Sequence, residues 1–97
     1  MKVELSDRAL REMQRIDASW RKQADLPALF LDELFETVEL VETTGVVGTT
    51  YSIKAKHRVH RLLMAKSEYH VYLVRKSDEL VVVVSIWSAR RRRGPKL

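Results

Sequence analysis

The 97-residue chain contains no cysteine and has only three glycines and two prolines. The absence of cysteine excludes disulfides, thiolate catalysis and zinc sites built on thiolates. No apolar run approaches the roughly 20 residues of a membrane-spanning helix, and the first residues lack the apolar stretch of a signal peptide. We therefore expect a cytoplasmic protein without a membrane segment, and a chain of this length predicts one domain over residues 1–97.

Several chemical motifs are also missing. The sequence has no glycine-rich phosphate loop, no nucleophile elbow and no His-Glu-x-x-His pair. His57 and His60 fall on a predicted strand, where a spacing of three residues directs them to opposite faces. Such histidines do not converge on a metal ion, so we expect neither a metal nor a cofactor. The acidic residues over 32–42 indicate a solvated helix face rather than a catalytic group.

The net charge of +5 is divided unevenly along the chain. Residues 1–45 hold six Lys or Arg and ten Asp or Glu, a net charge of −4. Residues 46–97 hold twelve Lys or Arg and three Asp or Glu, a net charge of +9. The asymmetry indicates an acidic structural half and a basic half that faces an anionic partner.

The first half of the chain predicts a strand and two helices. Alternation of apolar and charged residues predicts a strand over 2–5. Ser6 can cap a helix whose apolar stripe runs to Trp20. A second helix is expected from near Pro27, with Asp25 helping to cap it and Gly45 ending it. The short link between these helices predicts an antiparallel helical hairpin.

The second half predicts β-structure followed by a tail. We expect a loop over 46–56 that contains a short strand at 51–53, and then strands over 58–65, 69–76 and 80–87. Short connections make these strands antiparallel, and the β-branched strand 80–87 should be covered on both faces. The predicted fold class is α+β: an N-terminal strand, an antiparallel helical hairpin and an antiparallel β-meander, with the helices on one face of the sheet.

The basic residues are the main candidates for a functional surface. Arginine presents planar donors that suit phosphate and carboxylate groups. The four adjacent arginines over 90–93 repel one another, which favours an extended or partner-bound tail over 90–97. Aromatic residues on strands usually belong to the core, so we expect Trp87 to anchor this tail rather than touch a target.

Residues 58–91 resemble the RelE/ParE family of bacterial toxins. The resemblance consists of an arginine-bearing strand, the Tyr-x-Val-Tyr segment at 69–72, and a β-branched strand that ends in Trp-Ser-Ala-Arg-Arg. With the preceding helical hairpin it covers nearly the whole chain. It implies a toxin of a type II toxin–antitoxin system, paired with an antitoxin from the same operon. It also implies that operator DNA is contacted only through the antitoxin complex, and that the first strand pairs beside the last.

Two activities occur in this family: the RelE branch cuts messenger RNA in the ribosomal A site, and the ParE branch inhibits DNA gyrase. The positions used by the RelE branch correspond here to Arg61, Leu63, His70, Arg91 and Leu97. Leu63 and Leu97 supply neither charge nor a proton, and Ser88 stands where other ribonuclease members have a histidine. These departures favour a ParE-like toxin that acts by binding its target, with DNA gyrase as the expected target, over an enzyme.

The residues expected to contact the target are Arg58, Arg61, His70, Arg90, Arg91, Arg92 and Arg93. If the protein were instead a ribosome-dependent ribonuclease, its partners would be the ribosome and messenger RNA, and Arg61, His70 and Arg91 would be its catalytic residues. A basic nucleic-acid-binding module without toxicity is a third possibility. The antitoxin should be an acidic or amphipathic segment that folds on binding, and the residue pattern leaves open which surface it covers.

Overall fold

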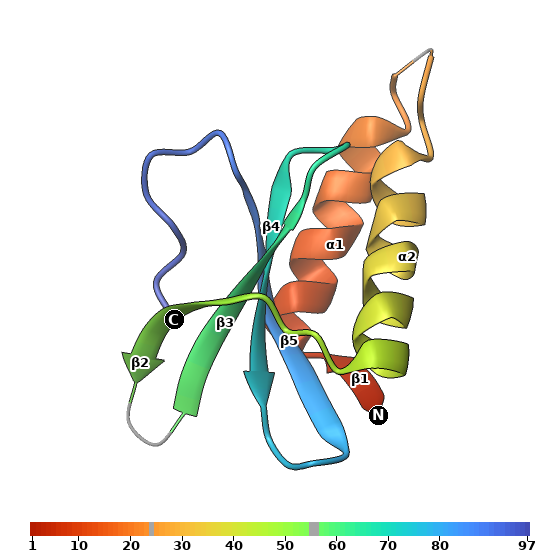
Figure 1. Ribbon diagram of the computed structural model, residues 1–97. Coiled ribbons are helices and arrows are strands. Elements are labelled where there is room, and N and C mark those ends of the chain that lie inside the picture. Colours follow the sequence, from red (N-terminus) through yellow and green to blue (C-terminus); the bar gives the residue numbers. More distant parts are fainter. Residues whose placement is uncertain (24, 55–56) are drawn as a thin grey trace.

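The computed structural model describes residues 1–23, 25–54 and 57–97. Its elements are β1 (Lys2–Leu5), α1 (Asp7–Trp20), α2 (Leu29–Thr44), β2 (Thr49–Lys54), β3 (His57–Met64), β4 (Tyr69–Arg75) and β5 (Leu80–Ser88). The strands form one sheet in the order β1-β5-β4-β3-β2, and both helices lie on the same face of it (Figure 1). The α+β prediction is therefore confirmed.

The sheet is antiparallel except at one edge. β1 runs parallel to β5, with Lys2 beside Leu80 and Leu5 beside Val83, whereas β2, β3, β4 and β5 pair antiparallel in sequence order. The expectation that the first strand pairs beside the last is confirmed. β1 can reach this edge because the helical hairpin crosses back over the sheet before the meander begins.

The helix boundaries follow local chemistry, with one difference from prediction. The Ser6 hydroxyl accepts a hydrogen bond from the Ala9 amide, as expected of an N-cap, and Gly45 ends α2 with a left-handed φ of 74°. α2 begins at Leu29 rather than near Pro27, because a turn closed by the Leu29 amide and the Leu26 carbonyl precedes it. The start is displaced, and no side-chain cap from Asp25 forms. Neither helix is long and apolar enough to span a membrane.

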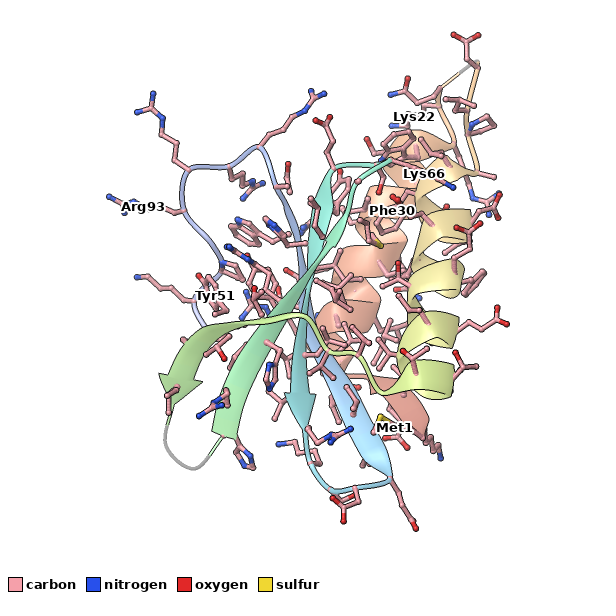
Figure 2. All side chains as sticks on the ribbon, viewed as in Figure 1. Met1, Lys22, Phe30, Tyr51, Lys66 and Arg93 are labelled. Atoms are coloured by element: carbon pink, nitrogen blue, oxygen red, sulfur yellow. The ribbon has the colours of Figure 1, made fainter. Side chains whose placement is uncertain are left out.

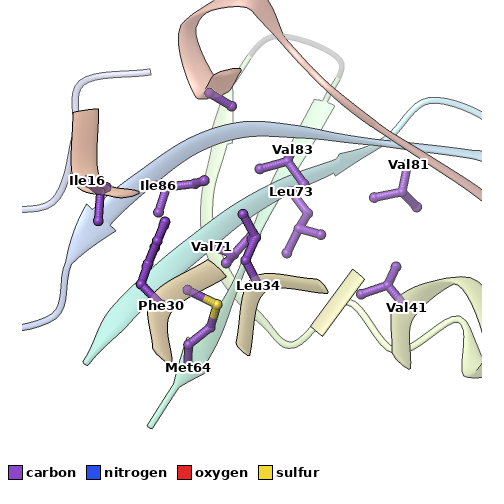
Figure 3. Close-up of a cluster of buried hydrophobic side chains, with 11 residues drawn as sticks. Ile16, Phe30, Leu34, Val41, Met64, Val71, Leu73, Val81, Val83 and Ile86 are labelled. Carbon is purple, nitrogen blue, oxygen red and sulfur yellow. The ribbon is translucent and has the colours of Figure 1, made fainter. Parts of the chain in front are cut away.

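The main hydrophobic core lies between the helices and the sheet (Figure 3). Its fully buried side chains come from every layer, and burying each of the larger ones contributes about 2 kcal/mol. They include Phe30, Leu34, Val41, Met64, Val71, Leu73, Val81, Val83 and Ile86. The apolar periodicity of α2 and the alternation of β4 predict much of this core, including Phe30, Leu34, Val71 and Leu73, but Phe35 on α2 is 60% exposed.

Strand β5 contains an irregularity that decides which residues face the helices. Tyr72 of β4 pairs with Ser85, but the next residue, Leu73, pairs with Val83. Val84 is thus an additional residue in β5, as in a β-bulge. As a result Val83 and Ile86 both belong to the main core, although their numbers differ by three.

A second, smaller cluster covers the face of the sheet opposite the helices, which we call the helix-free face. Its buried members are Val59, Tyr72 and Val74, with Tyr51, Val84, Trp87 and Leu97 packed against them. The prediction that β5 is covered on both faces is confirmed, because Val84 and Trp87 pack here while Val81 and Val83 pack under the helices.

The C-terminal tail covers part of the helix-free face. Its chain turns back from the end of β5, and the C-terminus lies beside β2 (Figure 1). Trp87 Nε1 donates to the Arg93 carbonyl at 2.8 Å, Arg8 donates to the Lys96 carbonyl, and Pro95 is buried. The tail is folded back and is not extended, because it covers the apolar cluster while the arginine side chains stay in water, where their repulsion is weak. The alternative of a partner-bound tail stays a prediction.

Glu33 corrects the interpretation of the acidic helix face. It is only 7% exposed, and its carboxylate accepts hydrogen bonds from the Lys66 amide, the Ser67 amide and the Ser67 hydroxyl at 2.8, 2.8 and 2.6 Å. Burial alone would raise the pKa of this carboxyl, but these hydrogen bonds outweigh it and hold the pKa below its ordinary value. Glu33 thus fastens α2 to the turn between β3 and β4.

Glu12 on α1 has a comparable role at the bulge. It is 6% exposed and accepts hydrogen bonds from the Ser85 hydroxyl at 2.9 Å and from the Ile86 amide at 3.2 Å. Arg8 lies 3.6 Å away and offsets its charge. Because a buried carboxylate needs such partners, Glu12 ties α1 to the place where the β5 register changes.

We predict that Glu33→Gln lowers the free energy of unfolding by about 2 kcal/mol. The neutral glutamine side chain lacks the negative charge that three hydrogen-bond donors stabilise in the parent protein. The matched control is Glu36→Gln, one helical turn further along. It removes only an exposed pair with Lys66 at 3.6 Å and should cost less than about 0.5 kcal/mol. Urea denaturation followed by tryptophan fluorescence measures both variants, and equal losses would contradict the role of Glu33.

Candidate functional site

Three of the predicted site residues meet on the helix-free face. His70 on β4 lies directly beside Trp87 on β5, and Arg61 on β3 lies beside Tyr72 on β4. Paired residues on neighbouring strands point to the same face. The Arg91 guanidinium carbon is 4.4 Å from the centroid of the Trp87 ring. We call the surface formed by Arg61, His70 and Arg91 the basic face.

Aromatic rings support the basic face from below. Tyr51 and Tyr72 pack edge to face with ring centroids 4.7 Å apart, and the Arg61 guanidinium carbon lies 5.4 Å from the Tyr51 centroid. His70 lies 6.1 Å from the Tyr72 ring. Tyr72 is only 1% exposed, so it belongs to the core, as expected of an aromatic residue on a strand. The rings hold the cations in place through packing and cation–π attraction.

The basic face sets the charge of His70. Burial first, and the positive charge of Arg61 second, hold the pKa of His70 below its ordinary value of 6.5. Burial also raises the pKa of Tyr72 above 10.0, although a hydrogen bond from Arg61 opposes that shift. At neutral pH the positive charge therefore comes from the arginines, and the His70 imidazole is mostly neutral and able to accept a proton.

The other predicted arginines lie elsewhere. Arg58 is three residues before Arg61 on β3, so the alternation of the strand places it on the opposite face. Arg90 is engaged by Glu68, to which its Nε donates at 2.8 Å. Arg92 and Arg93 are exposed on the loop that follows β5, and Figure 2 shows Arg93 pointing away from the sheet. Of these four arginines, only Arg92 and Arg93 therefore adjoin the basic face, because they follow Arg91 on the same loop.

The tail holds this loop through close backbone contacts. The Tyr51 hydroxyl donates to the Pro95 carbonyl at 3.4 Å, and the Trp87 indole donates to the Arg93 carbonyl. A Cβ atom on Gly94 would lie 2.1 Å from the Tyr51 hydroxyl oxygen and 2.8 Å from the ring carbon that bears it, so only glycine fits. The prediction that Trp87 anchors the tail is confirmed. The roles of Tyr51 and Gly94 were missed, because their contact spans 43 residues of sequence.

The basic face can bind an anionic group more readily than it can transform one. Two arginines offer forked donors for phosphate or carboxylate, and His70 adds one site for proton transfer. Leu63 lies beside His70 in the β3–β4 register and presents an apolar side chain that is 55% exposed. Over residues 1–23, 25–54 and 57–97, no three His, Asp or Glu side chains come close enough together to hold a metal ion.

Comparison with known proteins identifies the fold. No protein-family model and no curated protein sequence matches the chain. The structure does match a solved chain described as "Chromosomal ParDE TA system from P. aeruginosa", with a TM-score of 0.70 and 11% sequence identity. The match covers 93% of this chain and 97% of the other. At this identity the two chains share a fold, and a shared fold does not by itself assign an activity.

We predict that Arg61→Ala raises the pKa of His70 towards 6.5, because it removes the nearby positive charge. Arg58→Ala is the matched control, since Arg58 lowers the pKa of His60 through its charge after burial, the larger cause. The control should raise the pKa of His60 and leave that of His70 unchanged. NMR titration of the imidazole C–H resonances measures both values. A His70 pKa that responds equally to the two variants would contradict the geometry of the basic face.

A further prediction concerns the tail. Gly94→Ala should detach it from Tyr51 and lower stability by about 1–3 kcal/mol, since the added methyl overlaps the ring. Lys96→Ala is the control, because it keeps the carbonyl that Arg8 contacts. Hydrogen exchange of the Trp87 indole N–H reports the change: exchange should become fast in the Gly94 variant only. Slow exchange in both would show that the tail does not depend on this contact.

Proposed function

We propose that the chain is the toxin of a type II toxin–antitoxin module of the RelE/ParE family, closest to the ParE branch. In this proposal it stops growth by binding DNA gyrase and is neutralised by an antitoxin from the same operon. The observation that carries the proposal is the basic face, in which Arg61, His70 and Arg91 gather on the helix-free face of a fold shared with a ParDE chain. The resemblance of residues 58–91 to this family supports it independently.

Binding without cleavage is supported by the groups that surround His70. Cleavage of RNA at a 2′-hydroxyl requires a base, charge stabilisation at the phosphate and an acid for the leaving oxygen. Arg61 and Arg91 can stabilise charge and neutral His70 can accept a proton. Leu63 beside it is apolar, and Ser88 lies beside Tyr69, which packs against the main core on the other face of the sheet. Neither position supplies the acid.

The contact surface in this proposal is centred on the basic face and extends along the loop after β5. Arg92 and Arg93 are exposed and adjoin Arg91, so they extend the positive surface that gyrase would meet. Arg90 contributes less because Glu68 neutralises it, and Arg58 contributes less because it lies on the opposite face. Operator DNA would be bound only through the antitoxin complex.

One observation favours a second candidate, a ribosome-dependent messenger RNA endonuclease. Burial and the charge of Arg61 lower the pKa of His70 and so favour its neutral imidazole, which is the form that a general base requires. In that case Arg61, His70 and Arg91 would be the catalytic residues, and the ribosome with its messenger RNA would be the target.

The test is controlled expression in bacteria, followed by plasmid supercoiling and transcript integrity. We predict growth arrest with loss of negative supercoiling, relieved by the double variant Arg61→Ala, Arg91→Ala, because charged contacts hold the target. His70→Gln should retain most of the gyrase effect. Arg11→Ala on the exposed surface of α1 is the control and should remain as toxic as the parent protein.

The outcomes separate the candidates. Transcripts cut at codons while supercoiling stays normal, with activity abolished by His70→Gln, would replace the gyrase proposal by the endonuclease. Absence of any growth effect, together with absence of an antitoxin-sized reading frame beside the gene, would refute the toxin proposal. Circular dichroism of the double variant confirms that it is folded, because exposed arginines contribute little to stability.

A further inference from the structure

A groove at the end of the sheet shares Trp87 and Arg91 with the helix-free face, but the rest of its lining lies on the side of the helices. It has a volume of about 260 Å³ and opens where β5 ends, between the C-terminal half of α1 and the start of the tail. Its lining includes Arg15, Ser19, Tyr69, Ile86, Ser88 and Arg91. Ile16 and Ile86, which line it as well, belong to the core under the helices (Figure 3). Among the three residues of the basic face, only Arg91 also lines this groove.

The polar groups of this groove are suited to an anion. Its lining contains no carboxylate, and in the described part of the chain neither Arg15 nor Arg91 has an acidic partner. By contrast, Arg8 on the same helix and Arg21 directly after it are each paired with a carboxylate. The Ser88 hydroxyl accepts from the Arg90 amide, which leaves its own proton free to donate. Two unpaired guanidinium groups beside hydroxyl donors are the usual ligands of a phosphate.

The C-terminal end of α1 repels an anion in this groove less than a helix C-terminus usually would. A helix C-terminus is usually negative because its last carbonyls lack partners. Here the carbonyls of Asp17, Ser19 and Trp20 accept hydrogen bonds from the amides of the three residues that follow the helix, at 2.9, 3.3 and 2.8 Å. These hydrogen bonds reduce the negative partial charge that the end of α1 would otherwise present to an anion beside Arg15 and Arg91.

The groove continues into a second hollow that can hold an organic group. This hollow has a volume of about 410 Å³ and shares Ser19, Tyr69 and Ser88 with the first, and it extends to Trp20. Its own cations are engaged, since Lys66 lies 3.6 Å from Glu36 and Arg90 is paired with Glu68. The unpaired positive charge thus lies in the first hollow, and an indole ring is available in the second. Together they match the size of small-molecule sites.

We propose that this continuous groove binds a nucleotide, with the phosphate between Arg15 and Arg91 and the base towards Trp20. The donors fit the phosphate, and an indole face suits a base. The nucleotide could be free or part of a single-stranded nucleic acid, since both present the same phosphate and base. The proposal does not depend on gyrase as the target, because Arg61 and His70 lie on the opposite face of the sheet.

NMR titration of the full ¹⁵N-labelled chain tests this proposal, with AMP, inorganic phosphate and a short single-stranded RNA as separate probes. AMP should shift the resonances of Ser19, Ser88 and the Trp20 indole. Arg15→Gln should weaken AMP binding roughly tenfold, because one charged donor to the phosphate is lost. Arg11→Gln, which changes an exposed arginine of the same helix outside the groove, is the matched control and should bind AMP as the parent chain does.

Each outcome decides one point. Binding of AMP that depends on Arg15 supports a free nucleotide as the ligand, and binding of the RNA alone that depends on Arg15 supports a strand. Binding that Arg61→Ala abolishes and Arg15→Gln leaves intact would refute the groove and assign nucleotides to the basic face. Absence of shifts at Ser19 and Ser88 with all three probes would also refute it. None of these results alters the supercoiling test, so the two proposals fail separately.

Discussion

Strand β5 contains one residue more than the stretch of β4 that it pairs with, and both faces of the molecule depend on this irregularity. Because Leu73 pairs with Val83 and Tyr72 with Ser85, the alternation of β5 reverses at Val84. A regular strand would have turned Ile86 away from the helices and Trp87 into the main core. Glu12 receives the hydrogen bonds of Ser85 and Ile86 at this place, so α1 stabilises the altered register directly.

The bulge links packing to the candidate site. Trp87 emerges on the helix-free face, where it lies beside His70, stacks with Arg91 and holds the carbonyl of Arg93. The tail then turns back, and Pro95 and Leu97 cover apolar side chains that the helices leave exposed. The arginine loop is thereby presented from a fixed base, although its side chains extend into water.

The uneven distribution of charge also acquires a structural meaning. The acidic first half is more than a solvated scaffold, because Glu12 and Glu33 are buried and accept hydrogen bonds from residues of the basic second half. Glu33 fastens the β3–β4 turn, and Glu12 fastens β5. Among the residues that the structure describes, Arg90 is paired with Glu68 and Arg91 has no acidic partner, so neighbouring arginines differ in the charge that they offer to a ligand.

Local patterns in the sequence determined much of this protein. The Ser6 cap, the glycine at 45, the alternation of β3 and β4 and the placement of Tyr72 among core residues all follow from spacing and backbone preferences over a few residues. The resemblance of residues 58–91 led to the same fold as the structure. Local patterns also misled at the start of α2, where a turn over Leu26–Leu29 delayed the helix.

The tertiary structure alone decided which charged groups have partners. Glu33 meets Ser67 across 34 residues and Glu12 meets Ser85 across 73, so their helical spacing resembled that of solvated acids. The tail folds back because the helices leave the apolar cluster around Tyr72 uncovered. Residue 94 can approach the Tyr51 ring because glycine has no side chain. Arg61 and His70 meet through strand register, and Arg91 joins them through the ring of Trp87. Such contacts depend on distances through space, which a one-dimensional pattern of residues does not contain.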